Sequence, residues 1–226
     1  MKLLRHLPNV LTCGNLLCGC VGIIFTLQYA TSFAAWFVWA ACVFDFLDGF
    51  AARTLKVSSP IGKELDSLAD VVSFGVLPAI VMFQMIDILS SSPFLPYTAF
   101  ALVVFSALRL AKFNVDENQK DSFIGLPTPA NALFITSLIF LKPPWDFFIS
   151  NDLFLVAITL IFSLLLVSPW EMFGLKFKNF QWAENKVRFT FIVISVLLLA
   201  VGQAAALPFV ILFYILISLL MRWIRI

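Results

Sequence analysis

The sequence predicts an all-α integral membrane protein, organised as a single transmembrane domain over residues 1–226. Hydrophobic residues make up 62% of the chain, charged residues make up 12%, and the mean hydropathy is +1.00. This composition excludes a soluble globular domain. The lengths of the apolar stretches and the placement of the basic residues further predict about eight transmembrane helices, with the N- and C-termini cytoplasmic.

Apolar stretches of membrane-crossing length follow one another along the chain. A helix needs about 20 apolar residues to cross the hydrocarbon core of a bilayer, and the fifth and sixth stretches are shorter than that. The eight expected helices cover residues 9–30, 33–55, 63–86, 94–114, 127–141, 152–168, 188–204 and 206–224. Prolines stand near the proposed ends, where a missing backbone N–H costs least.

The basic residues support this topology. With the N-terminus inside, all of the 15 lysines and arginines except Lys142 and Arg109 fall in cytoplasmic segments. The outer loops carry Asp87, Asp146 and Asp152 instead. Because positive charge accumulates in cytoplasmic loops, we expect a cell inner membrane protein with these loops inside. The bilayer is the expected surrounding, and the net charge of +2 gives no reason to expect nucleic acid as a partner.

Two further features have open interpretations. Segment 171–188 interleaves aromatic and basic residues, which suits either a segment lying on the inner leaflet or an ordinary charged loop. The four cysteines all fall in the first two expected helices. Cys18 and Cys20 could bind a metal together, but free cysteines in helices are more typical of small packing residues.

Four aspartates interrupt the second and third apolar stretches. Asp45 and Asp48 are three residues apart near the inner end of the second, and Asp66 and Asp70 are four apart near the start of the third. Both spacings place the carboxylates on one helical face, and the short connection makes the two helices antiparallel neighbours. Ionisable groups at membrane depth are costly unless they pair or bind a cation. The pattern therefore predicts a site for two Mg²⁺ or Mn²⁺ ions, because these hard cations prefer oxygen ligands.

Small residues and an arginine accompany the aspartates. Gly49, Ala52 and Gly62 leave room for a nucleotide, and Arg53 offers a planar fork for phosphate oxygens. A salt-bridge network between two helices, or a proton path, is the alternative, and such a network would not need the glycines. A divalent-cation transporter is a more remote alternative, because the outer halves of both helices are almost wholly apolar.

The spacing of these residues resembles the signature of the CDP-alcohol phosphatidyltransferase family. All eight fixed positions are present: Asp45, Asp48, Gly49, Ala52, Arg53, Gly62, Asp66 and Asp70. The resemblance implies a homodimer that takes the phosphatidyl group from CDP-diacylglycerol. It also implies that all four aspartates bind metal, that Asp45 and Asp66 bridge two ions, and that Asp70 is the general base.

The resemblance extends to the residues that would contact the CDP-lipid. Arg53 is expected at the diphosphate, and Gly49 with the loop 58–59 at the CDP moiety. Polar residues of the first helix share part of one face and resemble the nucleotide-side segment of the family, although Asn9 could instead cap that helix. The expected CDP-lipid contacts are Asn9, Thr12, Asn15, Gly49, Ala52, Arg53, Ser59 and Gly62.

Three later segments resemble the branch of the family whose acceptor is L-serine. These segments are residues 66–78, 109–114 and 123–130. A pocket for serine or for a lipid phosphate is expected at Arg109, Lys112 and Asn114, because a cation at membrane depth needs an anionic partner. Alternatively, the Arg109 side chain extends to the cytoplasmic interface from the helix end.

These features predict an enzyme that transfers a phosphatidyl group to the hydroxyl of L-serine at the cytoplasmic face of the membrane. The expected reaction is a metal-assisted in-line displacement that releases CMP. Acceptors for phosphatidylglycerophosphate or phosphatidylinositol-phosphate synthesis are the alternatives, although a phosphorylated acceptor calls for a larger basic pocket. Residues 1–130 are expected to carry the catalytic core and residues 131–226 additional membrane helices.

Overall fold

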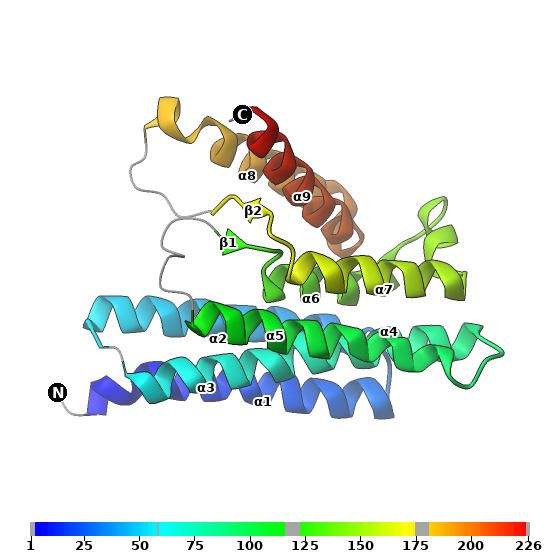
Figure 1. Ribbon diagram of the computed structural model, residues 1–226, viewed down its shortest axis with the longest axis horizontal. Helices are drawn as coiled ribbons and strands as arrows, with labels where there is room; N and C mark the ends of the chain where they lie inside the picture. The colour runs from blue at the N-terminus through cyan, green and yellow to red at the C-terminus, as the bar shows by residue number, and fades with distance from the viewer. Residues whose placement is uncertain (1–2, 58, 116–122, 175–180, 225–226) are drawn as a thin grey trace.

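The computed structural model describes residues 3–57, 59–115, 123–174 and 181–224, and most of them are helical (Figure 1). The α-helices are α1 (Leu7–Gln28), α2 (Phe33–Leu55), α3 (Pro60–Asp70), α4 (Leu77–Leu89), α5 (Ala101–Val115), α6 (Thr128–Ser137), α7 (Asp152–Leu166), α8 (Trp182–Gly202) and α9 (Leu207–Ile224). Shorter helical turns are η1 (Leu3–His6), η2 (Val71–Val76), η3 (Leu95–Phe100), η4 (Leu138–Phe140), η5 (Trp145–Ile149) and η6 (Gln203–Ala206).

The all-α prediction is confirmed for the described residues, with one small exception. Strands β1 (Phe123–Ile124) and β2 (Glu171–Met172) form an antiparallel pair that the sequence did not predict. Within the described residues, five helical segments are long and apolar enough to cross a membrane: 7–28, 33–55, 60–89, 95–115 and 185–223. The apolar helices over 128–140 and 152–166 are shorter. Each of the eight expected segments overlaps a helix, whereas the number of crossings and the sidedness stay predictions.

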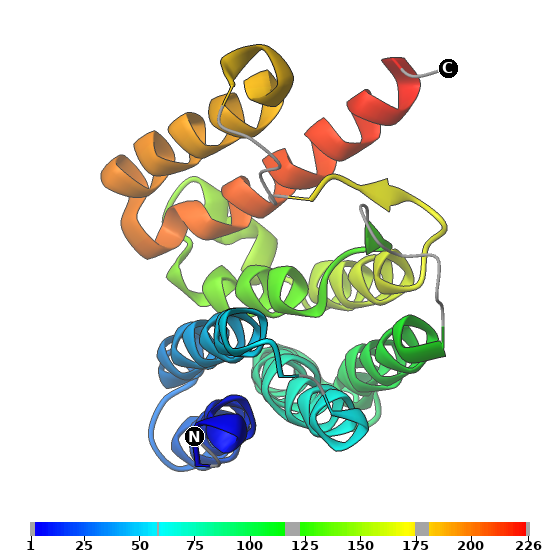
Figure 2. The same ribbon diagram turned by 90° about the vertical axis from the view of Figure 1, so that its left-hand side faces the viewer.

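The helices lie in successive layers, which Figure 2 shows nearly end-on. Helices α1 to α5 run roughly along one direction, and α6 and α7 lie against them. Helices α8 and α9 form a hairpin that crosses the far side of α6 and α7 at an angle. One apolar core joins α4 to α7 with α9, and a second joins α2, η2, α4 and α6.

The turn between α2 and α3 brings the two predicted aspartate pairs together. Helix α2 ends at Lys56, whose left-handed backbone (φ 52°) closes the helix with N–H bonds to the last carbonyls. Helix α3 begins at Pro60, and the hydroxyl of Ser59 accepts the backbone N–H of Gly62 at 3.0 Å. A serine N-cap followed by proline at the first helical position is a favoured helix start. The two helices therefore leave the turn with their aspartates side by side.

The third expected helix differs in detail from the prediction. It begins at Pro60, and the π-helical turn η2 directly follows Asp70. The sequence did not predict this turn, because a π-helical turn inside an apolar helix has no periodic signature of its own.

Segment 171–188 also differs, because α8 already begins at Trp182 and the end of the segment is helical. Residues 175–180 lie outside the described residues, so the inner-leaflet interpretation stays a prediction.

Candidate active site

Three of the four predicted aspartates meet between α2 and α3. One carboxylate oxygen from each of Asp45, Asp48 and Asp66 lies within 4.8 Å of the others. Asp48 is 7% exposed, and the other two are half-buried. Oδ1 of Asp66 is buried and has no hydrogen-bond partner among the described residues. Three hard oxygen donors at this spacing, one of them buried and unpaired, fit a hard divalent cation.

Asp70 lies one helical turn beyond Asp66 on α3 and is 7% exposed. Its Oδ1 accepts a hydrogen bond from the side-chain amide of Asn15 at 3.0 Å. Asp70 is within electrostatic range of the other three aspartates, but it is not one of the three whose oxygens lie within 4.8 Å of one another. The structure thus groups three predicted ligands and sets the predicted general base slightly apart.

Helix α1 holds the aspartates in place. The hydroxyl of Thr12 donates to Oδ2 of Asp48 at 2.7 Å, and Asn15 donates to Asp70 as described above. The backbone carbonyl of Asn15 in turn accepts the hydroxyl of Ser73 at 2.8 Å. Two of the polar residues that the sequence placed on one face of this helix therefore contact carboxylates directly.

A cavity of about 220 Å³ opens beside the aspartates, and we call it the donor cavity because residues predicted to contact the CDP-lipid donor line it. Asp48 and Asp66 line it together with most of the predicted CDP-lipid contacts. Those predicted residues in its lining are Asn9, Thr12, Gly49, Ala52, Ser59 and Gly62. A Cβ atom on Gly62 would lie 3.0 Å from both the Asn9 Oδ1 and the Ser59 Oγ, so a side chain there would crowd the cavity.

Two predicted contacts are absent from the residues that line the donor cavity. Asn15 is bonded to Asp70 deeper in the bundle. Arg53 is exposed, and its Nε donates to the backbone carbonyl of Gly49 at 3.0 Å. Its guanidinium therefore lies close to Gly49, which does line the cavity. Ser58 lies outside the described residues.

Sequence reasoning missed two cations in the donor cavity. Arg5 and Lys63 both line it, and both are exposed. Each lies within about one helical turn of a predicted contact, Arg5 before Asn9 and Lys63 next to Gly62. This proximity is a signal in the sequence, although the sequence analysis uses both residues only to assign the cytoplasmic side.

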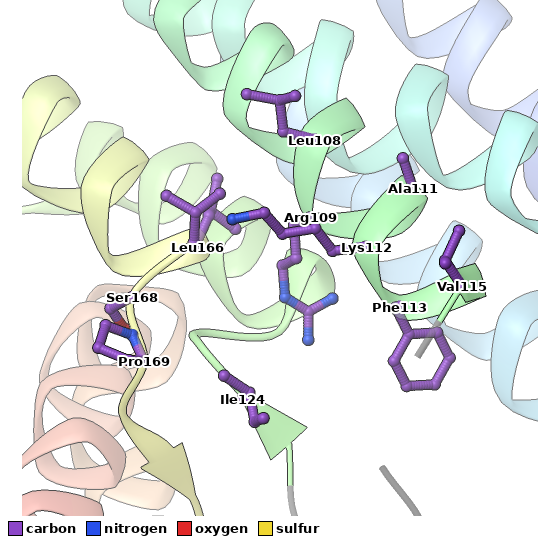
Figure 3. A pocket seen from close by; sticks show the side chains of 11 residues that line it. Leu108, Arg109, Ala111, Lys112, Phe113, Val115, Ile124, Leu166, Ser168 and Pro169 are labelled. Atoms are coloured by element: carbon purple, nitrogen blue, oxygen red, sulfur yellow. The ribbon is translucent and has the colours of Figure 1, made fainter. Parts of the chain in front are cut away.

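Arg109 lies at a second and larger cavity of about 630 Å³, which we call the arginine cavity. Figure 3 shows its guanidinium pointing from α5 toward the segment around Ile124. Arg109 is 8% exposed, and its Nε has no hydrogen-bond partner among the described residues. It lies within electrostatic range of Asp70. The rest of the lining is mainly apolar and comes from α5, β1 and residues 166–169.

The other two residues predicted for this pocket differ from each other. Lys112 lines the arginine cavity and is exposed. Asn114 does not line it, because its side-chain amide donates to the Ser67 hydroxyl at 2.9 Å. Its backbone carbonyl also accepts the ammonium group of Lys63 at 2.6 Å. Asn114 therefore connects the end of α5 to α3, next to the turn that carries Asp66.

A short strap fixes the start of α6 beside the arginine cavity. The N–H of Gly125 donates to the Trp170 carbonyl, and the N–H of Leu126 donates to the Leu165 carbonyl, both at 2.9 Å. Gly125 has a φ of 76°, and a Cβ atom there would collide with the Leu166 carbonyl oxygen. A glycine is needed because L-residues with side chains are strained in this region and meet the α7 backbone.

The chain is similar to a family of lipid-modifying enzymes over most of its length. The family model described as CDP-alcohol phosphatidyltransferase matches residues 5–170. A CDP-diacylglycerol–serine O-phosphatidyltransferase of Helicobacter pylori (strain J99) is 33% identical over 222 residues, covering 96% of this chain and 90% of the relative. The Bacillus subtilis enzyme of the same name is 34% identical over 142 residues, covering 62% and 79% respectively. The one from Mycobacterium tuberculosis (strain H37Rv) is 30% identical over 223 residues, covering 95% and 76%.

Proposed function

The chain belongs to the CDP-alcohol phosphatidyltransferase family, and we propose that it transfers the phosphatidyl group of CDP-diacylglycerol to the hydroxyl of L-serine. The products are phosphatidylserine and CMP. Membership confirms the resemblance carried by the motif from Asp45 to Asp70. The observation that carries the proposal is the convergence of these aspartates beside the donor cavity, in a chain whose relatives bear the name of this activity.

The donor cavity is proposed to bind the CDP head of the lipid. Gly49, Ala52 and Gly62 leave its walls without bulky side chains, and Ser59 and Asn9 offer polar atoms. A diphosphate needs cations, and three basic residues lie at or beside this cavity: Arg5, Arg53 and Lys63. One guanidinium group can bind two phosphate oxygens at once. The arginines therefore suit the binding of a diphosphate better than a lysine does.

Asp45, Asp48 and Asp66 are proposed to hold Mg²⁺ or Mn²⁺, with Asp70 as a further ligand and two ions per site. When bound, the ions would neutralise the diphosphate and stabilise the charge on the departing CMP. The donor set supports this assignment, because it consists of carboxylate oxygens and includes the unpaired Asp66 Oδ1. Thr12 orients the Asp48 carboxylate by its hydrogen bond, in the way that neighbouring donors orient metal ligands.

Asp70 is proposed to act as the general base. It accepts the proton of the serine hydroxyl as that oxygen bonds to the lipid-side phosphorus, and the bond from this phosphorus to the CMP oxygen breaks. The geometry supports this role in two ways, because Asp70 is buried and one of its oxygens is already held by Asn15. The other carboxylate oxygen is then left to receive the proton.

Arg109 is proposed to bind the serine carboxylate. It is a buried cation whose Nε is unpaired, and a cation in this setting needs an anion. Arg109 interacts electrostatically with Asp70, which supports placing the proposed carboxylate site and the proposed base in the same part of the bundle. Lys112 at the edge of the arginine cavity adds positive charge.

The enzyme is proposed to lie in a cell inner membrane with this site at the cytoplasmic face, as a homodimer. The placement of basic residues in the expected cytoplasmic segments supports this orientation. The catalytic core is proposed to lie within residues 1–130, with the remaining helices covering it.

The test uses the purified chain in detergent with CDP-diacylglycerol and Mg²⁺ or Mn²⁺. We expect release of CMP and formation of phosphatidylserine when L-serine is added, and neither with glycerol 3-phosphate or inositol. Release of CMP without serine, or phospholipid formation from one of the other acceptors, would overturn the proposed acceptor.

A further inference from the structure

Thr128 and Asn131 are buried polar residues at the start of α6 that the reaction described above does not use. Thr128 is 1% exposed and Asn131 is fully buried. Neither the Thr128 hydroxyl nor the Asn131 amide oxygen or nitrogen has a hydrogen-bond partner among the described residues. Leaving such groups unpaired in a protein interior is unfavourable, so each of them calls for a partner. Other buried polar groups of α6 are hydrogen-bonded, since the hydroxyl of Thr136 donates to the Ala132 carbonyl.

Packing places these residues at the level of the aspartates. Ala132 of α6 shares an apolar core with Val38 of α2 and Phe74 of η2. Leu133 lines a groove with Cys42, which lies one turn before Asp45. Asp45 and Asp70 both lie within electrostatic range of Cys42. Helix α6 therefore packs directly on the part of the bundle that carries the site.

The direction of α6 shows which residues of α6 and α2 lie at the same level. The turn η4, which directly follows α6, contacts the first half of α2, since the rings of Phe140 and Trp39 lie 6.5 Å apart. The two helices are thus antiparallel, and the first turn of α6 faces the stretch of α2 that follows Cys42. Asp70 similarly precedes Phe74 by one turn. Thr128 and Asn131 precede Ala132 on α6 and so reach the level of Asp45 and Asp70.

The arginine cavity lies beside the same turn. Ile124 lines the arginine cavity. The next two residues, Gly125 and Leu126, make the backbone hydrogen bonds that fix the start of α6. Figure 3 shows the Arg109 guanidinium directed toward this connection. The start of α6 therefore lies beside the arginine cavity. Among the described residues, the side chains there with unpaired buried atoms are Arg109 of α5 and Thr128 and Asn131 of α6.

We propose that Thr128 and Asn131 bind the amino-acid head of the acceptor, which rests on the proposed function. The Thr128 hydroxyl and the Asn131 amide N–H donate to the carboxylate beside Arg109, and the Asn131 Oδ1 accepts from the ammonium group. A side-chain amide carries a donor and an acceptor together, which matches a carboxylate and an ammonium on one carbon. The positive end of the α6 dipole also favours the carboxylate there.

The test measures kcat and KM for L-serine and for CDP-diacylglycerol in Thr128→Val and Asn131→Leu. Each change should raise the KM for serine by about tenfold or more and change the KM for CDP-diacylglycerol by less than about twofold. Thr136→Val is the matched control, because Thr136 is equally buried on the same helix but is bonded within it. Its KM for serine should not change.

Two acceptor analogues separate this role from loss of structure. Ethanolamine lacks the carboxylate, and 3-hydroxypropionate lacks the ammonium group. The preference for serine over each analogue is the ratio of their kcat/KM values. This ratio should be about tenfold lower in Asn131→Leu than in the unmodified chain. Thr128→Ser keeps the hydroxyl and should restore the serine KM. If the Leu variant does not fold, the pair Thr128→Val and Thr128→Ser decides the question.

An unchanged serine KM and unchanged preferences in folded variants would overturn this inference while leaving the proposed function intact. Failure of the unmodified chain to use serine at all would instead overturn the proposed function.

Discussion

The donor cavity and the arginine cavity differ in how their polar groups are satisfied. Around the donor cavity, Thr12 and Asn15 of α1 already hold Asp48 and Asp70, so the carboxylates are positioned before any ligand arrives. Around the arginine cavity, the buried Nε of Arg109 has no hydrogen-bond partner in the described part of the chain. A site for cations and a diphosphate needs fixed ligands, whereas a site for a small zwitterion can leave its hydrogen bonds for the substrate. Hydrogen bonds from α1 thus position the proposed metal ligand Asp48 and the proposed base Asp70, whereas the buried Arg109 Nε, with no partner among the described residues, is left for the proposed acceptor.

The largest expected effect is loss of a metal ligand. Asp66→Asn removes a carboxylate from the group of three, and turnover should fall by about a thousandfold or more. CMP release at saturating substrates and metal measures it. Asp87→Asn is the control, because Asp87 is exposed near the other end of the same helical segment. Activity above about a tenth of the unmodified level in Asp66→Asn would remove this residue from the metal site.

The next effect separates the base from the metal ligands. Asp70→Asn should lower kcat by about a hundredfold or more, because a general base contributes that much. It should spare CDP-diacylglycerol binding more than Asp45→Asn does, since Asp45 belongs to the group of three carboxylates. Equilibrium binding of the CDP-lipid in both variants measures the difference. An equal loss of binding in the two variants would contradict the base role.

A smaller effect tests whether α1 pre-positions the carboxylates. Thr12→Val removes the hydrogen bond to Asp48 and should weaken Mn²⁺ binding by about tenfold, as loss of an orienting partner does. The Mn²⁺ dependence of both CMP release and the thermal unfolding midpoint provides two readouts. Thr26→Val is the matched control on the same helix, because the Thr26 hydroxyl donates to the Gly22 carbonyl and, in the described part of the chain, contacts no carboxylate. Equal Mn²⁺ dependence in the two variants would show that Thr12 has no orienting role.

Much of the donor side could be predicted from the sequence, because its information is local. The spacings of Asp45 with Asp48 and of Asp66 with Asp70 fix a helical face, and Ser59 with Pro60 marks a helix start. Most of the CDP-lipid residues predicted from the motif do line the donor cavity.

The acceptor side depends on tertiary packing and was harder to predict. The resemblance of segment 109–114 to the serine branch predicts Asn114 in the pocket, but its side chain bonds to Ser67 on another helix. The β1–β2 pair joins two-residue strands far apart in the chain, which leaves no local pattern. The unpaired state of Thr128 and Asn131 is visible only once the neighbours on α2 and η2 are placed.

The most direct test of the division between the two cavities is the pair of Michaelis constants in Arg109→Gln. We expect the KM for L-serine to rise by about tenfold or more and the KM for CDP-diacylglycerol to change by less than about twofold. Arg109→Lys keeps the charge but loses the planar fork. Its KM for serine should lie between that of the unmodified chain and that of Arg109→Gln. Lys112→Gln removes a charge from the same cavity and should raise the KM for serine less than Arg109→Gln does, because Lys112 is exposed. An unchanged KM for serine together with a raised KM for CDP-diacylglycerol would contradict the account, because Arg109 would then serve the donor.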